Sequence, residues 1–270
     1  MWDRELRILI EAMTLAGAEA LRFASEGFEI HTKPDRSPVT SADLAIDRIL
    51  HAHLLGTFPE DGWLSEESPD DPARLQKRRI WVIDPIDGTN AFIRREPEFC
   101  ISVALVEDGR PVVAAIFNPS SDELFAAMKG GGLLLNQEPV SPEKDREDQS
   151  PVIALSLSEL RIGRFQSIEA SATSRPMRSI AWALALAASG RIHAVATLEL
   201  ENEWDVAAGA LLIEEAGGTM CDGSGQALGF NRTVPRYEGI IAAHPSCPDF
   251  VVRQLRSISW TGKSSQPKGL

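Results

Sequence analysis

Residues 81–90, WVIDPIDGTN, end an apolar run with two aspartates three positions apart and then turn at once. A turn needs at most one of these acids, because a single aspartate suffices to hydrogen-bond the backbone two residues on. Pro85 stiffens the segment, so Asp84, the carbonyl of Ile86 and Asp87 can converge on one point. Carboxylate and carbonyl oxygens are the ligands of hard cations such as Mg²⁺. The spacing favours a cation site, although Asp-Pro-x-Asp-Gly alone is also typical of a simple capped turn.

Gly88 and Thr89 follow the second aspartate at the predicted start of a helix. The first backbone N–H groups of a helix lack a partner within the helix and attract anions. We therefore expect Gly88 and Thr89 to bind phosphate beside the cation site.

Two further segments place acids at the ends of predicted elements. Glu66 and Glu67 follow the strand-like WLS, and Asp205 opens the helical pattern WDVAAG. Taken singly, the glutamate pair is typical of a solvated surface and Asp205 of a helix N-terminus. Together with DPIDGT, however, they fit two divalent cations roughly 3.5 to 4 Å apart, which share bridging carboxylates and assist displacement at phosphorus.

The composition is that of a globular protein with an excess of acids. The chain has 270 residues, 43 % apolar and 24 % charged, and a formal net charge of −12. This charge opposes attraction to nucleic acid and to anionic membranes, so we expect neither as a partner. The cysteines number three and lack metal-ligand spacing, which favours a reducing cytoplasm over a disulfide framework. No signal-peptide core and no apolar run of membrane-spanning length is present in the sequence.

Periodicity predicts an α+β first half. One amphipathic helix is expected from Arg4 to about Ser25, and a second from near Ser41, capped by Thr40. The segment EDGR, 107–110, predicts a hairpin between two β-rich runs. The predicted strands are residues 80–84, 101–106, 111–117 and about 123–128.

The second half alternates strand and helix, which predicts an α/β layer. Its elements are expected at VIALSL, an alanine-rich helix near 179–189, IHAVATL, and the helix WDVAAGALLIEEAGG, whose glycine pair suits a C-cap. The segment 141–151 is rich in polar residues and is the predicted boundary. The expected domains are residues 1–140, a linker at 141–151, residues 152–260, and a disordered tail at 261–270.

The four motifs SPVTSADLAID, WLSEES, WVIDPIDGTNAFI and WDVAAGALLIEEAGG, in this order, closely resemble the inositol monophosphatase superfamily. The resemblance covers nearly the whole chain. It implies a layered αβαβα sandwich of the inositol monophosphatase and fructose-1,6-bisphosphatase type, usually dimeric. It also implies a lithium-sensitive phosphatase that uses two or three Mg²⁺ ions to hydrolyse small phosphate esters.

The resemblance assigns roles residue by residue. Thr89 and Asp43 match the pair that orients the attacking water and helps to deprotonate it. Glu66 matches a neighbouring acid that aids a further metal. The matched metal ligands are Glu67, Asp84, the carbonyl of Ile86, Asp87 and Asp205.

Within the superfamily, KPDRSPVTSADLAID and SEES most resemble the CysQ-type 3′(2′),5′-bisphosphate nucleotidases, which remove one phosphate from adenosine bisphosphate. Three positions depart from that branch, because Leu157, Ala183 and Glu201 stand where its basic residues are expected. Arg178 is then the remaining cation expected near a second phosphate. Losing one charged partner of a phosphate typically costs about 1.5 to 3 kcal/mol.

Two alternatives therefore stay open beside the nucleotidase. One is a phosphatase for inositol 1-phosphate or another polyol or sugar phosphate, whose hydroxyl groups would meet Glu199 or Glu201. The other is a non-catalytic interaction protein, a role that some family members have. The presence of all matched metal ligands favours an enzyme.

Overall fold

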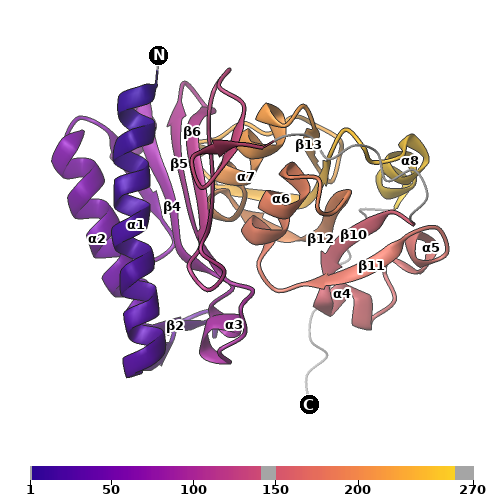
Figure 1. The fold of residues 1–270 in the computed structure, drawn as a ribbon, viewed down its shortest axis with the longest axis horizontal. Helices are drawn as coiled ribbons and strands as arrows, with labels where there is room; N and C mark the ends of the chain where they lie inside the picture. Colours follow the sequence, from indigo (N-terminus) through magenta and orange to yellow (C-terminus); the bar gives the residue numbers. More distant parts are fainter. Residues whose placement is uncertain (1, 141–149, 259–270) are drawn as a thin grey trace.

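The computed structural model describes residues 2–140 and 150–258. The predicted tail lies outside these residues, and so does nearly all of the predicted linker. Within them, α-helices and β-sheets alternate in layers (Figure 1). The predicted αβαβα sandwich is thus confirmed.

The first two layers are a helix pair and the larger sheet. Apolar side chains spaced along one face of each helix, such as Leu9, Met13 and Leu50, are fully buried against the sheet. Both helices match their predicted ranges: α1 (Asp3–Glu26) and α2 (Ser41–Thr57). The sheet runs in the order β3 (Gly62–Ser65), β4 (Arg79–Asp87), β5 (Cys100–Glu107), β6 (Arg110–Asn118), β7 (Glu123–Met128), β8 (Leu133–Leu135) and β9 (Glu138–Pro139).

Strands β3 and β4 are parallel and the remaining neighbours in this sheet are antiparallel, which confirms the predicted hairpin and the third strand. Strand β4 continues beyond the predicted residues 80–84 into the DPID motif. Its register with β5 shifts between Asp84 and Asp87. This irregularity lets both acids leave the regular alternation of a strand.

The middle layer consists of two helices covered by a sheet on each side (Figure 1). Every residue of α6 (Ile180–Ala188) is buried, which explains why its sequence is apolar on all sides rather than amphipathic. Helix α7 (Glu203–Glu215) packs on α6 and on β4, β5 and β6. The predicted C-cap is confirmed, because Gly217 takes a φ of +78° directly after this helix.

The second sheet mixes parallel and antiparallel pairs. Strand β12 is longer than the predicted IHAVATL and reaches the start of α7. Residue Leu157, predicted as the end of a strand, begins a short helix instead. The sheet runs in the order β11 (Thr173–Met177), β10 (Val152–Ser156), β12 (Ala194–Asn202), β14 (Arg236–Ala243) and β13 (Thr219–Asp222).

Several short elements complete the fold. Helices α5 (Gln166–Glu169) and α8 (Asp249–Ser257) cover the outer face of the second sheet. The others are β1 (Ile30–Thr32), β2 (Pro38–Thr40), the 3₁₀-helix η1 (Pro72–Gln76), α3 (Thr89–Ile93) and α4 (Leu157–Arg161).

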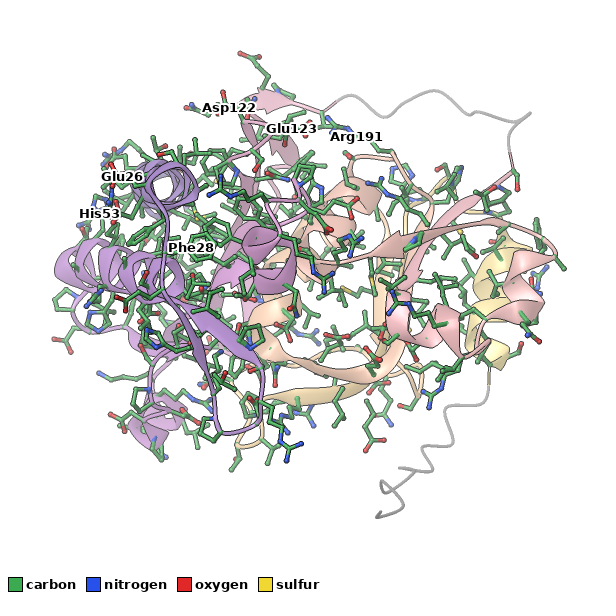
Figure 2. The ribbon with its side chains drawn as sticks, turned by 90° about the horizontal axis from the view of Figure 1, so that it is seen from below. Glu26, Phe28, His53, Asp122, Glu123 and Arg191 are labelled. Carbon is green, nitrogen blue, oxygen red and sulfur yellow. The ribbon has the colours of Figure 1, made fainter. Side chains whose placement is uncertain are left out.

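Contacts outside the core join distant segments. Phe28, just beyond α1, stacks on Phe92 of α3 with ring centroids 4.8 Å apart. Figure 2 shows Arg191 beside Glu123, and their side chains form an ion pair of 2.5 Å between the two halves of the chain.

All three cysteines are buried and free. In the ranges that the structure describes, no helix is long and apolar enough to span a membrane.

Candidate active site

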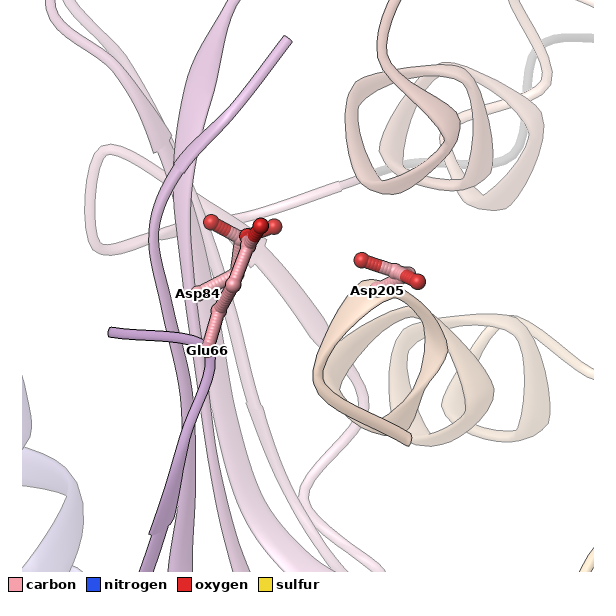
Figure 3. A group of neighbouring side chains, drawn as sticks. All are labelled: Glu66, Asp84 and Asp205. Atoms are coloured by element: carbon pink, nitrogen blue, oxygen red, sulfur yellow. The ribbon is translucent and has the colours of Figure 1, made fainter. Parts of the chain in front are cut away.

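Three carboxylates from distant parts of the sequence meet at one point (Figure 3). Glu66, Asp84 and Asp205 each offer an oxygen, and these oxygens all lie within 4.8 Å of one another. Glu66 directly follows β3 and Asp84 lies in β4 of the larger sheet, whereas Asp205 comes from the first turn of α7. The site therefore lies between the larger sheet and the helical layer.

Local structure explains each position. The amide of Glu66 donates to the carbonyl of Ile83 at 3.2 Å, which holds Glu66 beside β4. Asp205 is the third residue of α7, and its Oδ2 accepts the amide of Asn202 at 2.6 Å in a capping box. The second oxygen of Asp205 is left for the site. One residue thus both starts the helix and contributes to the acidic group.

The acidic group is electrostatically unfavourable by itself. Burial raises the pKa of Asp84 well above its usual value, and the charges of Glu66, Asp87 and Asp205 raise it further. The pKa of Asp205 is raised by burial and by Asp87 and Glu66. All the donors are oxygens, and a divalent cation would offset their repulsion. The residues present therefore fit Mg²⁺.

Asp87 faces the start of α6. Its Oδ2 accepts the Ser179 hydroxyl and the amide of Ala181, each at 2.6 Å. Burial raises the pKa of Asp87 to about 6 despite these bonds. Asp87 is thus fixed beside the three-acid group through a helix of the second half.

Glu66 and Glu67 differ in surroundings although they are neighbours. Lys33 donates to both, at 2.7 Å to each carboxylate. Glu67 is not one of the three acids that meet, and its side chain is 5 % exposed against 25 % for Glu66. Burial raises the pKa of Glu67 to about 7. Glu66 therefore occupies the place in the acidic group that the sequence analysis assigned to Glu67.

Asp43 and Thr89 lie within reach of each other. The Thr89 hydroxyl is 3.4 Å from Oδ1 of Asp43 and donates to the carbonyl of Ile86 at 3.1 Å. The other oxygen of Asp43 accepts the amide and hydroxyl of Thr40. Burial raises the pKa of Asp43 to about 6.

Gly88 caps α3 with a φ of +89°, and a Cβ there would lie 2.9 Å from the carbonyl oxygen of Glu98. Only glycine fits this turn without displacing the neighbouring backbone.

The predicted substrate residues divide into two groups. Arg178 and Glu199 line a cavity of about 390 Å³, together with Leu157. Glu201 is not among its lining residues, and the pKa of Glu201 is raised by burial and by the charges of Asp205, Asp87 and Glu199. Ala183 is 4 % exposed and lines a different, much smaller cavity.

Two residues that line the cavity of about 390 Å³ were not predicted by the sequence analysis. Arg94 follows α3 and Arg161 ends α4, and both line the cavity with Arg178. Neither has a motif around it that marks it as functional. The nearest signal was the place of Arg94 just after the DGTNAFI segment.

Comparison with known proteins agrees with this geometry. The model of the inositol monophosphatase family matches residues 1–259. The chain belongs to the inositol monophosphatase family. Among its relatives in the family, the inositol-1-monophosphatase of Rhizobium meliloti (strain 1021) is 33 % identical over 230 residues, which cover 82 % of this chain and 86 % of that protein.

Two other family members extend the comparison. The Nus factor SuhB of Xylella fastidiosa is 32 % identical over 230 residues, which cover 82 % of each protein. The solved structure of Thermotoga maritima IMPase superposes with a TM-score of 0.81 at 25 % identity and covers 96 % of this chain and 98 % of that one. The chain is thus a phosphatase of a family that depends on Mg²⁺.

Proposed function

We propose that this family member is a Mg²⁺-dependent phosphomonoesterase whose leading substrate is 3′(2′)-phosphoadenosine 5′-phosphate. The observation that supports it most is the meeting of Glu66, Asp84 and Asp205 beside the start of α3. Carboxylates in such a group serve cations, and backbone N–H groups at the start of a helix, here Gly88 and Thr89, suit a phosphate.

The cations would be held by five groups. We assign Glu66 rather than Glu67 to the first site, because Glu66 lies with the other acids and Glu67 is not part of that group. When bound, two or three Mg²⁺ ions supply Lewis-acid activation of water and offset the negative charge of the phosphate. The proposed ligands are Glu66, Asp84, the carbonyl of Ile86, Asp87 and Asp205.

The side chains of Thr89 and Asp43 would handle the proton of the attacking water. The Thr89 hydroxyl is placed between Asp43 and the carbonyl of Ile86, so it can accept a proton from water while donating its own to Asp43. The raised pKa of Asp43, about 6, suits a group that accepts a proton near neutral pH. The amides of Gly88 and Thr89 would orient the phosphate. No covalent enzyme intermediate is required.

The alternative substrate is inositol 1-phosphate or a related polyol or sugar phosphate. Relatives named inositol monophosphatase favour it, and Glu199, held by Ser156 and Ser158, offers a carboxylate to a substrate hydroxyl. A third, less favoured alternative is a non-catalytic interaction role. The relative named Nus factor SuhB is the reason to retain it. We also propose a homodimer in the cytoplasm, which size-exclusion chromatography and fractionation would test.

The deciding experiment is phosphate release by the purified protein with Mg²⁺. Adenosine 3′,5′-bisphosphate, inositol 1-phosphate and fructose 1,6-bisphosphate would each be compared, with EDTA and with Li⁺ as inhibitors. We expect metal-dependent turnover that EDTA abolishes, with a preference for the nucleotide. Preference for inositol 1-phosphate would favour the alternative, and no turnover of any ester would favour an interaction role.

A further inference from the structure

The cavity of about 390 Å³ is built from four separate segments beside the acidic group. They are the start and end of α3, the junction of β10 with α4, the residues before α6, and the middle of β12. The lining residues are Asn90, Ala91, Arg94, Ser156, Leu157, Ser158, Arg161, Met177, Arg178 and Glu199.

The lining is positively charged in a protein that is strongly negative. It contains three arginines and one carboxylate, whereas the whole chain has a net charge of −12. Within the described ranges, the guanidinium groups of Arg94 and Arg161 have neither an ion pair nor a hydrogen bond. Arg178 pairs with Glu96 at 2.8 Å, and Glu96 does not line the cavity.

Some other arginines on the surface are instead neutralised by a carboxylate. Arg7 pairs with Glu11 at 2.8 Å, and Arg22 with Glu26 at 2.6 Å. The single carboxylate of the cavity, Glu199, is occupied by the hydroxyls of Ser156 and Ser158. The cavity therefore has cationic groups that no residue of the described chain neutralises.

The cavity also adjoins the site of the proposed reaction. Asn90 and Ala91 directly follow the Gly88–Thr89 turn in α3. Arg178 precedes Ser179, whose hydroxyl donates to Asp87 at 2.6 Å. A substrate whose phosphate lies at the acidic group can thus extend into the cavity.

We propose that this cavity is a subsite for a second anionic group of the substrate, a phosphate or a carboxylate, bound by Arg94, Arg161 and Arg178. This inference rests on the proposed phosphatase function and deepens it. Guanidinium groups match the oxygens of phosphate and carboxylate in paired hydrogen bonds, and unpaired ones need not first release a protein carboxylate. The subsite replaces the basic residues missing at Leu157, Ala183 and Glu201.

The test compares esters that differ only in the second anion. One pair is adenosine 3′,5′-bisphosphate and adenosine 3′-monophosphate, and the other is 3-phosphoglycerate and glycerol 3-phosphate. We expect the wild-type enzyme to have a kcat/KM about tenfold or more higher for the two-anion member of at least one pair. Which pair responds distinguishes a phosphate from a carboxylate.

Arg94→Gln and Arg161→Gln should each lower this ratio about threefold to tenfold, chiefly through KM for the two-anion ester. Arg95→Gln is the matched control, because Arg95 is also exposed and is adjacent to Arg94 but does not line the cavity. It removes the same charge from the long-range field and should leave both kcat/KM values unchanged.

A wild-type ratio near one for both pairs, or a ratio that Arg95→Gln lowers as much as Arg161→Gln, would overturn the subsite while leaving the phosphatase function intact. If no ester were hydrolysed, the proposed function would fail. Calorimetric binding of adenosine 3′,5′-bisphosphate to wild type and to Arg161→Gln would then decide the subsite: weaker binding by the variant supports it, and equal or absent binding overturns it.

Discussion

Asp87 has a negative charge beside the acidic group and also accepts hydrogen bonds from the start of α6. A substitution that removes the charge but keeps a hydrogen-bond acceptor can therefore test the two roles separately. An asparagine at this position keeps an oxygen for the Ser179 hydroxyl and the Ala181 amide, but it removes a negative charge from the metal site. We expect Asp87→Asn to lower kcat by at least about 100-fold. Thermal unfolding without metal should change little, because no core packing is lost.

Asp122→Asn provides the control for this variant. Asp122 is exposed and has a φ of +54°, a conformation that asparagine accepts readily. Its turnover should equal that of the wild type. Wild-type turnover by Asp87→Asn as well would show that Asp87 does not bind a catalytic cation.

For single residues, the sequence indicated which side chains are suited to bind a cation, but it did not indicate which side chains contact one another in the fold. Asp84, Asp87 and Asp205 stand in motifs whose spacing already indicates a cation site. The choice between Glu66 and Glu67 depends on which of the two carboxylates the fold brings to Asp84 and Asp205, and no local pattern indicates that contact. Arg94 and Arg161 were missed for the same reason, since only the folded chain brings them together with Arg178.

At the scale of elements, the close approach of α6 and α7 depends on Gly209. A Cβ at this position would lie 2.5 Å from Cδ1 and 2.7 Å from Cβ of Leu184. We expect Gly209→Ala to lower the free energy of unfolding by about 2 kcal/mol, because the helices must move apart or Leu184 must leave its rotamer. Thermal unfolding measures this loss.

Gly56→Ala is the matched control. Gly56 is also helical, in the last turn of α2, but an added Cβ meets nothing within 4 Å. This substitution should leave stability unchanged or raise it by up to about 1 kcal/mol. Equal losses from both variants would mean that the contact with Leu184 is not what requires glycine at position 209.

The long amphipathic helices and the hairpin were predictable, whereas strands β11 and β14 were not. Helices α1 and α2 and the β5–β6 hairpin follow from periodicity and from capping or turn residues. Strand β14 was missed because it pairs with β12 and β13 across long stretches of sequence. Strand β11 was missed because its residues are exposed or only partly buried and so lack an apolar pattern.

For the whole molecule, the buried acids make stability depend on pH and metal. The pKa of Asp43 is raised from 3.8 to about 6 and that of Glu67 from 4.5 to about 7. Such groups favour folding while they are protonated, and this contribution is lost as the pH rises through these values. For Asp43 alone it amounts to about 3 kcal/mol. We expect the metal-free protein to unfold at a lower temperature at pH 8 than at pH 5.

Magnesium should reverse this trend, because a bound cation stabilises the ionised carboxylates. Thermal unfolding with EDTA and with Mg²⁺, at constant ionic strength, would measure both effects. The increase in melting temperature on adding Mg²⁺ should be larger at pH 8 than at pH 5. An equal increase at both values would show that the cation does not act on these acids.

The middle helical layer has a consequence for how the chain acquires activity. Asp205 reaches Glu66 and Asp84 only after α7 has packed between the two sheets, so neither half of the chain holds a complete site. A partly folded chain, during synthesis or after damage, would therefore neither capture Mg²⁺ firmly nor attack the cell's phosphate esters. Catalysis in this protein therefore requires that α7 is packed between the two sheets.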